Sequence, residues 1–177
     1  ASLCYWYHFQ KSGLRIETQS DETSLAGYFL NLLHQKDVDS SQLKLMDASL
    51  TLYAEHELNA STFAARVSAA TLTDFYSTIT AAIGTLRGPL HGGANEAAMA
   101  LIARFKNVDE AATELRAMLD RKEKIMGFGH RVYKVRDPRS DIIKAWSKKL
   151  SQEQGDKVLF AVSEKIEQVM MSEKKMF

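Results

Sequence analysis

Apolar residues recur along this chain at the three- and four-residue spacing of amphipathic helices, with polar residues between them. Strict alternation of apolar and polar residues is absent, and only residues 125–126 and 131–133 could be extended. The pattern therefore predicts an all-α protein. Asp21 or Thr23 is the expected N-cap of the first clear helix. The expected helices cover residues 25–33, 43–53, 61–70, 75–86, 95–105, 109–122, 142–150 and 158–174.

The strongest interruption of this helical pattern lies at residues 88–93. Gly88-Pro89 ends one helix, and Gly92-Gly93 precedes the next, so this short stretch holds four flexible or turn-forming residues. No internal repeat and no low-complexity linker occurs elsewhere. We expect this segment to be a hinge between two lobes.

Composition narrows the range of functions. The chain has 177 residues, 45% of them hydrophobic, and 23 basic residues stand against 22 acidic ones, for a net charge of +1. That balance argues against a nucleic-acid surface. Cys4 is the only cysteine, so no internal disulfide forms and a reducing compartment is favoured. No apolar run approaches the ~18 residues of a membrane span, and no signal-peptide pattern opens the sequence, so a cytoplasmic protein is expected.

Three of the five histidines stand in segments suited to chemistry. Two of them are flanked by glycine, which lacks a side chain and lets a substrate approach the main chain closely. Histidine also exchanges protons near neutral pH. The segments are Glu55-His56-Glu57, residues 88–96 (GPLHGGANE) around His91, and residues 127–130 (GFGH) ending on His130.

His91 lies just before the expected helix over residues 95–105. Free N–H groups and the positive end of the helix dipole point there, which disfavours an imidazolium. A neutral imidazole N–H is suited to hydrogen-bonding a developing enolate oxygen. The alternative is a glycine-rich helix turn that contains an incidental histidine.

His130 follows two glycines that expose main-chain N–H groups, and it begins a basic stretch that suits phosphates and carboxylates. Arg139, placed directly after Pro138, is the best candidate for a bidentate carboxylate clamp. The residues 127–129 do not match a dinucleotide or phosphate-loop fingerprint. A solvated basic loop is the alternative reading of this stretch.

His56 lies between two glutamates near a helix break, and a half-buried histidine at a helix end is the alternative there. A zinc site built from His56, His91 and His130 is possible in principle, although no spacing favours it. We therefore predict no metal. His8 and His34 lie in aromatic or leucine-rich helical stretches and are expected to have packing or surface roles.

Together these segments resemble the citrate synthase family. The resemblance rests on motifs in family order, and it covers essentially the whole chain. Residues 3–9 (LCYWYHF) and 139–144 (RSDIIK) look most like the 2-methylcitrate synthase branch. The motifs that carry the family resemblance are His56-Glu57-x-Asn59-Ala60-Ser61, residues 88–96, and Gly127-Phe128-Gly129-His130 continuing to Asp137-Pro138-Arg139.

The resemblance implies a condensation of propionyl-CoA, oxaloacetate and water to 2-methylcitrate and CoA, with citrate formation from acetyl-CoA as the neighbouring alternative. His91 would hydrogen-bond the thioester oxygen as the enol forms. His130 would polarise the keto group of oxaloacetate and supply a proton. His56 and Arg139 would hold its carboxylates. No metal and no permanently bound cofactor is implied, because the CoA thioester is a substrate.

The resemblance also implies how the chain is organised. Residues 1–91 would be the C-terminal part of a large helical domain, and residues 92–177 most of a small domain on the CoA-binding side. Family members are homodimers or dimer-built hexamers, and we expect residues 61–86 to contribute to that contact. The backbone of the glycine loop would cradle the adenine of CoA, with Lys134 near its phosphates. The expected CoA-binding residues are Ile125, Met126, Gly127, Phe128, Gly129 and Lys134.

One departure from the family is plain. The family's general-base aspartate stands in a Pro-Asn-x-Asp segment, which is expected directly after Phe177 and does not occur in this sequence. We therefore expect the chain to be an internal fragment without turnover of its own. The alternative from a different class is a non-catalytic helical module that binds a CoA-like nucleotide or a partner chain.

Overall fold

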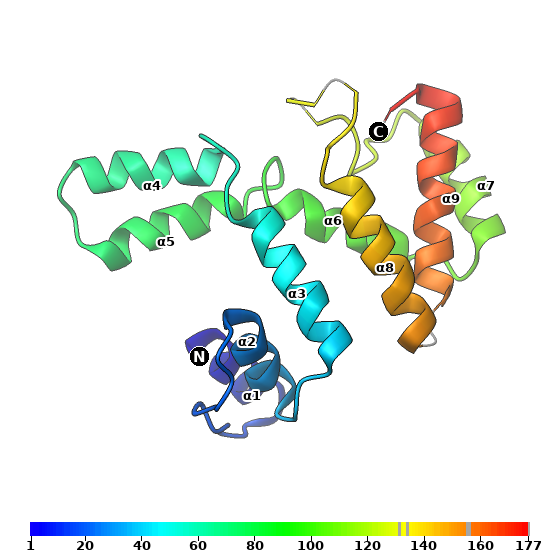
Figure 1. The fold of residues 1–177 in the computed structure, drawn as a ribbon. Helices are drawn as coiled ribbons and strands as arrows, with labels where there is room; N and C mark the ends of the chain where they lie inside the picture. The colour runs from blue at the N-terminus through cyan, green and yellow to red at the C-terminus, as the bar shows by residue number, and fades with distance from the viewer. Residues whose placement is uncertain (131, 134, 155–156, 177) are drawn as a thin grey trace. The chain divides into compact units, whose positions relative to one another are not determined.

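The computed structural model describes residues 1–130, 132–133, 135–154 and 157–176. These residues form nine α-helices and no strand, so the predicted all-α class is confirmed (Figure 1). Contacts divide the chain into two compact units, residues 1–55 and 56–177. The domain boundary expected at residues 91 and 92 stays a prediction. No helix in the described part of the chain combines the length and the apolar character that crossing a bilayer requires.

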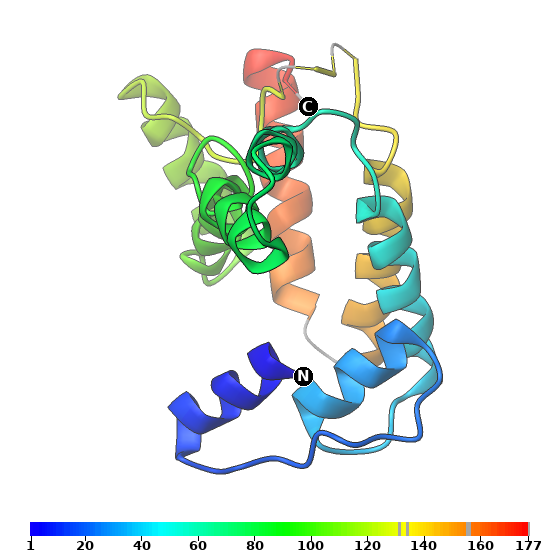
Figure 2. The same cartoon turned by 90° about the vertical axis from the view of Figure 1, so that its left-hand side faces the viewer.

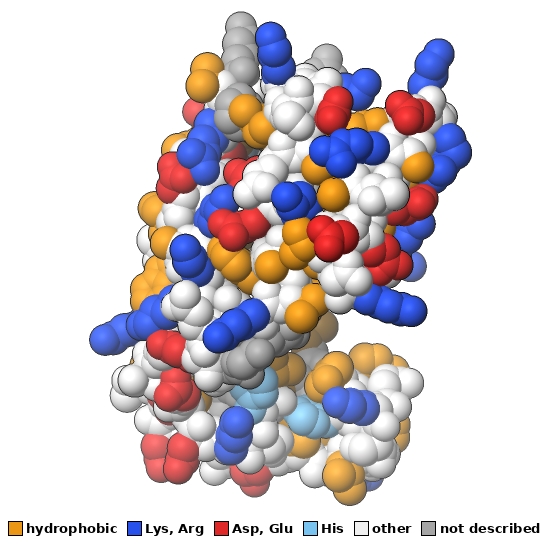
Figure 3. All heavy atoms as spheres, turned by 90° about the vertical axis from the view of Figure 1, so that its right-hand side faces the viewer, with side chains coloured by type: hydrophobic (Ala, Val, Ile, Leu, Met, Phe, Trp, Pro, Cys, Tyr) orange, Lys and Arg blue, Asp and Glu red, His pale blue; other side chains and the backbone are white. Residues whose placement is uncertain are grey.

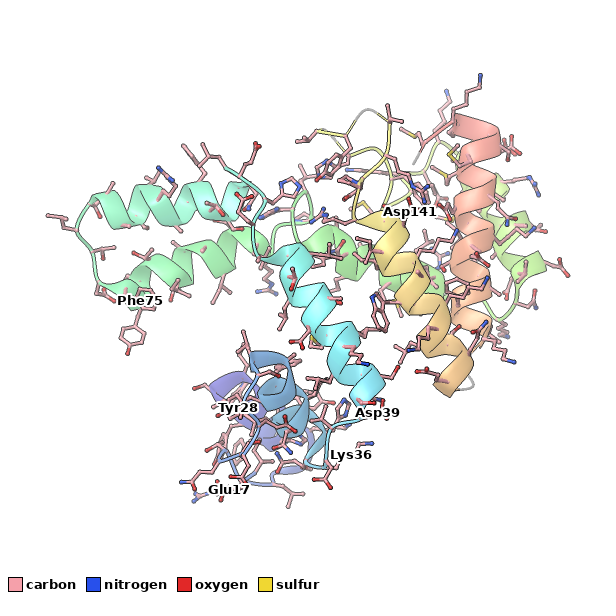
Figure 4. All side chains as sticks on the ribbon, viewed as in Figure 1. Glu17, Tyr28, Lys36, Asp39, Phe75 and Asp141 are labelled. Atoms are coloured by element: carbon pink, nitrogen blue, oxygen red, sulfur yellow. The ribbon has the colours of Figure 1, made fainter. Side chains whose placement is uncertain are left out.

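The first unit contains α1 (Ser2–Ser12), α2 (Leu25–His34) and α3 (Ser40–Tyr53). The N-cap of α2 is Ser24, whose side chain accepts a hydrogen bond from the Gly27 N–H, so the expected cap at Asp21 or Thr23 is wrong. The cap is Ser24 because a capping side chain must directly precede the first helical residue, Leu25, to reach the free N–H groups. Asp39 caps α3 in the same way (Figure 4).

The core of the first unit is small. Its fully or nearly fully buried apolar side chains come from α1 and α2, and they are Cys4, Ala26, Leu30 and Leu32. His8 closes the end of α2, because its Nε2 lies 2.9 Å from the Leu33 carbonyl oxygen and 3.2 Å from that of Leu32. Carbonyl oxygens only accept, so Nε2 carries a proton and satisfies groups that the helix end leaves open.

The second unit begins with an antiparallel helical hairpin, α4 (Ala60–Ala70) and α5 (Phe75–Leu86). The two helices lie side by side and extend away from α7, α8 and α9 (Figure 1). Neither helix buries a single side chain fully. A polar side chain caps the N-terminus of each helix. The Asn59 side chain accepts from the Thr62 N–H in α4, and the Asp74 side chain accepts from the Ser77 N–H in α5.

The core of the second unit lies where α6 (Gly93–Ala103), α7 (Val108–Asp120) and α9 (Lys157–Lys174) meet. In both ribbon views α9 lies between α7 and α8 (Ser140–Gln154), and it contacts both (Figures 1 and 2). Burying one apolar side of each helix supplies the main driving force for this arrangement. The buried cluster is Leu101, Phe105, Ala111, Leu115, Met118, Ile125, Val162, Ile166, Val169 and Met170.

The solvent side of this helical layer mixes charges of both signs, as Figure 3 shows for one face. Arg116 on α7 pairs with Glu173 on α9 at 3.2 Å, and Arg121 pairs with Glu114 at 2.9 Å. Exposed pairs of this kind contribute little to stability, because water and salt screen the attraction between the charges. The buried apolar cluster, and not these ion pairs, therefore accounts for most of the stability of the layer.

Candidate active site

Two aromatic side chains from one loop meet a histidine from a distant turn. The His56 ring, just before α4, lies 5.9 Å from the His130 ring and 5.8 Å from the Tyr133 ring, measured between centroids. The His130 and Tyr133 rings are 4.7 Å apart and tilted by 35°. The Tyr133 hydroxyl and His56 Nε2 are hydrogen-bonded at 2.9 Å. The structure thus brings together two of the predicted site residues, His56 and His130, and adds Tyr133.

The tautomer of His130 is fixed by its own loop. The Val132 backbone N–H donates to His130 Nδ1 at 3.2 Å. A backbone N–H can only donate, so Nδ1 must present its lone pair and the ring proton of the neutral form lies on Nε2. His130 is exposed. The Nε2–H of His130 is therefore available to donate a hydrogen bond to a ligand.

His91 is held in the opposite sense. The Ser61 backbone N–H donates to His91 Nε2 at 3.3 Å, and the Ser61 hydroxyl lies 2.8 Å from the same nitrogen. Since the amide can only donate, Nε2 is the acceptor and Nδ1 carries the proton. The Ser61 hydroxyl also lies 2.9 Å from Asn59 Oδ1, so its single proton has two possible acceptors. This arrangement leaves His91 neutral, with its one N–H at Nδ1.

The glycines after His91 make the close turn possible. A Cβ on Gly93 would lie 2.5 Å from the Arg87 carbonyl oxygen and 2.9 Å from that of Gly88, both backbone atoms. The Gly93 N–H itself donates to the Gly88 carbonyl oxygen at 3.2 Å. Only a residue without a side chain allows this approach. The turn places His91 at the start of α6, which confirms its predicted position at a helix N-terminus.

One short segment connects the two groups of side chains. His56 reaches the loop that carries His130, whereas Ser61, five residues later, holds His91. Among the described residues, no hydrogen bond or ring contact joins His91 directly to His130. The structure therefore anchors both histidines to the segment of residues 56–61.

Arg139 grips a carboxylate within its own turn. Its Nε and Nη2 donate to Asp137 Oδ1 and Oδ2 at 3.0 and 2.7 Å, and its backbone N–H donates to Oδ1 at 2.9 Å. The side-chain hydrogen bonds from Arg139 hold the pKa of Asp137 below its usual value. The two side chains are only 21% and 25% exposed. Asp137 engages the guanidinium fork in this structure, and the role of Arg139 in holding a substrate carboxylate stays a prediction.

The glycine loop is built as a tight, left-handed bend. Gly127 has φ 98° and Gly129 has φ 78°, values that disfavour other residues. Ile125 is buried in the core and Phe128 packs against it. Their side chains therefore anchor the loop, whereas Gly127 and Gly129 are exposed. Lys134, the expected phosphate contact, lies outside the described residues.

Sequence reasoning did not assign a role to Ser61 or Tyr133. Ser61 belongs to a motif that carried the family resemblance, but the motif did not indicate what Ser61 does. Nothing in the sequence indicated the contact of Tyr133, because its partner His56 is 77 residues away. In the described part of the chain, no three His, Cys, Asp or Glu side chains are arranged to share a metal ion.

Comparison with known proteins agrees with these motifs. The family model described as citrate synthase, C-terminal domain, matches residues 1–177. The chain is 54% identical over 175 residues to a 2-methylcitrate synthase of Shewanella oneidensis, covering 99% of this chain and 47% of that protein. It is 46% identical over 166 residues to citrate synthase 2 of Bacillus subtilis, covering 94% and 45%.

A solved structure shows the same fold. The citrate synthase of the archaeon Thermoplasma acidophilum, in ternary complex with carboxymethyl coenzyme A and oxaloacetate, superposes with a TM-score of 0.90 at 33% identity. The match covers 99% of this chain and 48% of that one. The chain thus spans about half the length of the relatives it matches. It belongs to the citrate synthase family, as the motifs predicted.

Proposed function

Because this chain belongs to the citrate synthase family, we propose that the protein condenses propionyl-CoA with oxaloacetate and water to give 2-methylcitrate and CoA. The observation that carries this proposal is the pair of fixed tautomers, Nδ1–H on His91 and Nε2–H on His130. Each ring has one nitrogen committed to a backbone amide and one N–H left to donate. Two neutral donors suit a reaction in which negative charge develops on two oxygens in turn.

The first step forms the carbon nucleophile. The α-proton of the thioester passes to a carboxylate, and His91 Nδ1–H donates to the thioester oxygen as the enol forms. The family's Pro-Asn-x-Asp segment does not occur in the sequence. The carboxylate that takes the α-proton is therefore not among the site residues named above. Because the α-carbon is weakly acidic, the hydrogen bond from His91 must strengthen as charge develops on the oxygen.

The second step joins the two substrates. The nucleophilic carbon attacks the keto carbon of oxaloacetate, and a carbon–carbon bond forms as the keto C=O π bond opens. The keto oxygen takes the proton from His130 Nε2, and the α-proton held by the carboxylate restores it to His130. His56 holds one carboxylate of oxaloacetate, and Arg139 holds the other after its Nε and Nη2 exchange Asp137 for the substrate, both by charge-assisted hydrogen bonds. Water then cleaves the carbon–sulfur bond of the condensed thioester, and CoA leaves as the thiol. The main chain of residues 125–129 and Lys134 bind CoA itself.

Acetyl-CoA is the second candidate substrate, because several similar proteins are named citrate synthase and one of Bacillus subtilis is named citrate/2-methylcitrate synthase. One extra methylene changes binding by only ~1–3 kcal/mol. We favour propionyl-CoA because the identity to the 2-methylcitrate synthase, at 54%, exceeds the 46% to citrate synthase 2.

The test measures release of the CoA thiol by the full-length gene product, with propionyl-CoA and acetyl-CoA compared at the same oxaloacetate concentration. We expect a higher kcat/KM for propionyl-CoA. His91→Ala and His130→Ala should each lower kcat by about 10²–10³-fold, the usual loss of a transition-state donor. His34→Ala is the matched control, since that histidine is exposed. Binding of CoA without any thiol release would favour the non-catalytic module instead.

We also propose that the protein is a homodimer, or a larger assembly of dimers, and that the α4–α5 hairpin contributes to the contact. Large apolar side chains on the hairpin are exposed, among them Phe63 at 59%, Phe75 at 72% and Ile83 at 58%. Phe75 points away from the hairpin at the start of α5 (Figure 4). Ile83→Glu should convert the full-length protein to monomers in sedimentation velocity, whereas the exposed Arg66→Glu should weaken the contact less.

A further inference from the structure

We infer that Tyr133 is a positioning residue, which orients the His56 ring toward an oxaloacetate carboxylate and supports the ring of His130. The inference rests on the proposed function, because it takes oxaloacetate as the ligand of His56. Tyr133 is half-buried and lies in the loop between His130 and Arg139. It is the described residue that contacts both imidazoles.

The hydroxyl of Tyr133 decides which nitrogen of His56 faces a ligand. It occupies Nε2 at 2.9 Å, and among the described residues Nδ1 has no hydrogen-bond partner. If the phenol donates to Nε2, the proton of a neutral ring lies on Nδ1. If the ring is charged, both nitrogens carry protons and Nε2–H donates to the phenol oxygen. A third, neutral form, in which Nε2–H donates to the phenol oxygen, leaves Nδ1 as an acceptor. A carboxylate at Nδ1 selects the first two forms, and the phenol can pair with Nε2 in both of them, because its oxygen can either donate or accept.

Without the hydroxyl, the His56 ring is free to turn by half a revolution, which puts the carbons Cδ2 and Cε1 in the places of Nδ1 and Nε2. In the turned orientation a C–H group, and not Nδ1–H, would face the carboxylate, and the form with the proton on Nδ1 would lose the donor that pairs with its Nε2. Ordering the ring would have to take place on binding, and that cost would appear as weaker affinity for oxaloacetate.

The ring of Tyr133 has a second, separable effect. Its centroid lies 4.7 Å from that of His130, closer than the 5.8 Å to His56. Aromatic contacts at this distance restrict the orientation of the partner ring. Among the described residues, the other contacts that hold the His130 ring are the hydrogen bond from the Val132 N–H and the ring contact with His56 at 5.9 Å. The hydroxyl therefore acts on binding through His56, and the ring acts on the proton donor His130.

Tyr133→Phe removes the hydroxyl and keeps the ring. It should raise the KM for oxaloacetate about 2- to 12-fold, the net value of one hydrogen bond, and leave kcat within about twofold. Tyr133→Leu should in addition lower kcat. Tyr28→Phe is the matched control, because its hydroxyl donates to the Thr18 carbonyl oxygen at 2.9 Å in the other unit (Figure 4). It should change neither constant.

A double-mutant cycle separates positioning from a general structural role. In a His56→Ala background, Tyr133→Phe should raise KM by less than about twofold, because the group through which it acts is gone. The full increase in that background would overturn the inference, as would an unchanged KM in Tyr133→Phe alone. A lower melting temperature with unchanged KM would also overturn it.

Oxaloacetate binding, measured by calorimetry on the full-length protein, distinguishes this inference from the proposed function. If the wild-type protein turns over and Tyr133→Phe has the same KM for oxaloacetate, only the role of Tyr133 is rejected. Wild-type protein that binds oxaloacetate without releasing CoA, and binds it more weakly after Tyr133→Phe, rejects the proposed function alone. Failure of the wild type to bind oxaloacetate rejects both.

Discussion

Replacing Ser61 by alanine tests how His91 is held. The hydroxyl lies 2.8 Å from His91 Nε2 and 2.9 Å from Asn59 Oδ1, but it has one proton, so at most one donated bond to the histidine is lost. A neutral hydrogen bond contributes ~0.5–1.5 kcal/mol net. The backbone N–H of residue 61 still donates to Nε2 in the variant, so the tautomer of His91 does not change.

The expected result is therefore a modest loss. Since about 1.4 kcal/mol corresponds to a factor of ten, kcat of the full-length protein should fall roughly 2- to 12-fold in Ser61→Ala, measured by thiol release at saturating substrates. Ser172→Ala, which removes a hydroxyl that donates to the Val169 carbonyl oxygen within α9, should leave kcat unchanged. A loss beyond 100-fold would refute the reasoning, because it would give the hydroxyl a direct part in proton transfer.

Three further outcomes follow from packing and charge. Gly93→Ala should lower the free energy of unfolding by ~1–3 kcal/mol, since its Cβ would lie 2.5 Å from the Arg87 carbonyl oxygen; an unchanged urea midpoint would contradict this. Leu115→Ala, at a side chain with 0% exposure, should cost ~2–5 kcal/mol in the same assay, and less than 1 kcal/mol would argue against the α7–α9 core. Asp137→Asn should destabilise the protein at pH 7, because the hydrogen bonds from Arg139 lower the pKa of Asp137 in the folded state. The stabilisation is fully present above the unfolded pKa of ~3.9 and is lost as pH falls through the lowered folded pKa of Asp137. The difference between wild type and variant should therefore shrink as the pH falls below ~3.9, and a difference that does not shrink would contradict the assignment.

Much of the secondary structure could be predicted, because it follows from local spacing. The helix predicted over residues 75–86 is α5, Phe75–Leu86, and the expected helix over residues 158–174 is α9, Lys157–Lys174. Both have side chains that repeat with the helical period and boundaries set by neighbouring residues. The cap of α2 was misplaced because several capping residues precede that helix, and sequence spacing does not decide among them.

The exposure of the α4–α5 hairpin could not be predicted in the same way. Its apolar side chains also recur with the helical period, yet neither hairpin helix has a buried side chain. Periodicity indicates which face of a helix seeks contact, but the contacting surface is a property of the assembled fold. The stripe therefore predicted the helices correctly and gave no information on their burial.

The sequence by itself determined the all-α class, the family and the identity of the three histidines, because helical periodicity and glycine-flanked motifs are local features of the chain. Only the tertiary structure decided which nitrogen of His91 and His56 is free. The partners that settle this, Ser61 and Tyr133, are 30 and 77 residues away. A ring has two chemically different nitrogens, and which one accepts or donates depends on the atoms placed beside it by folding.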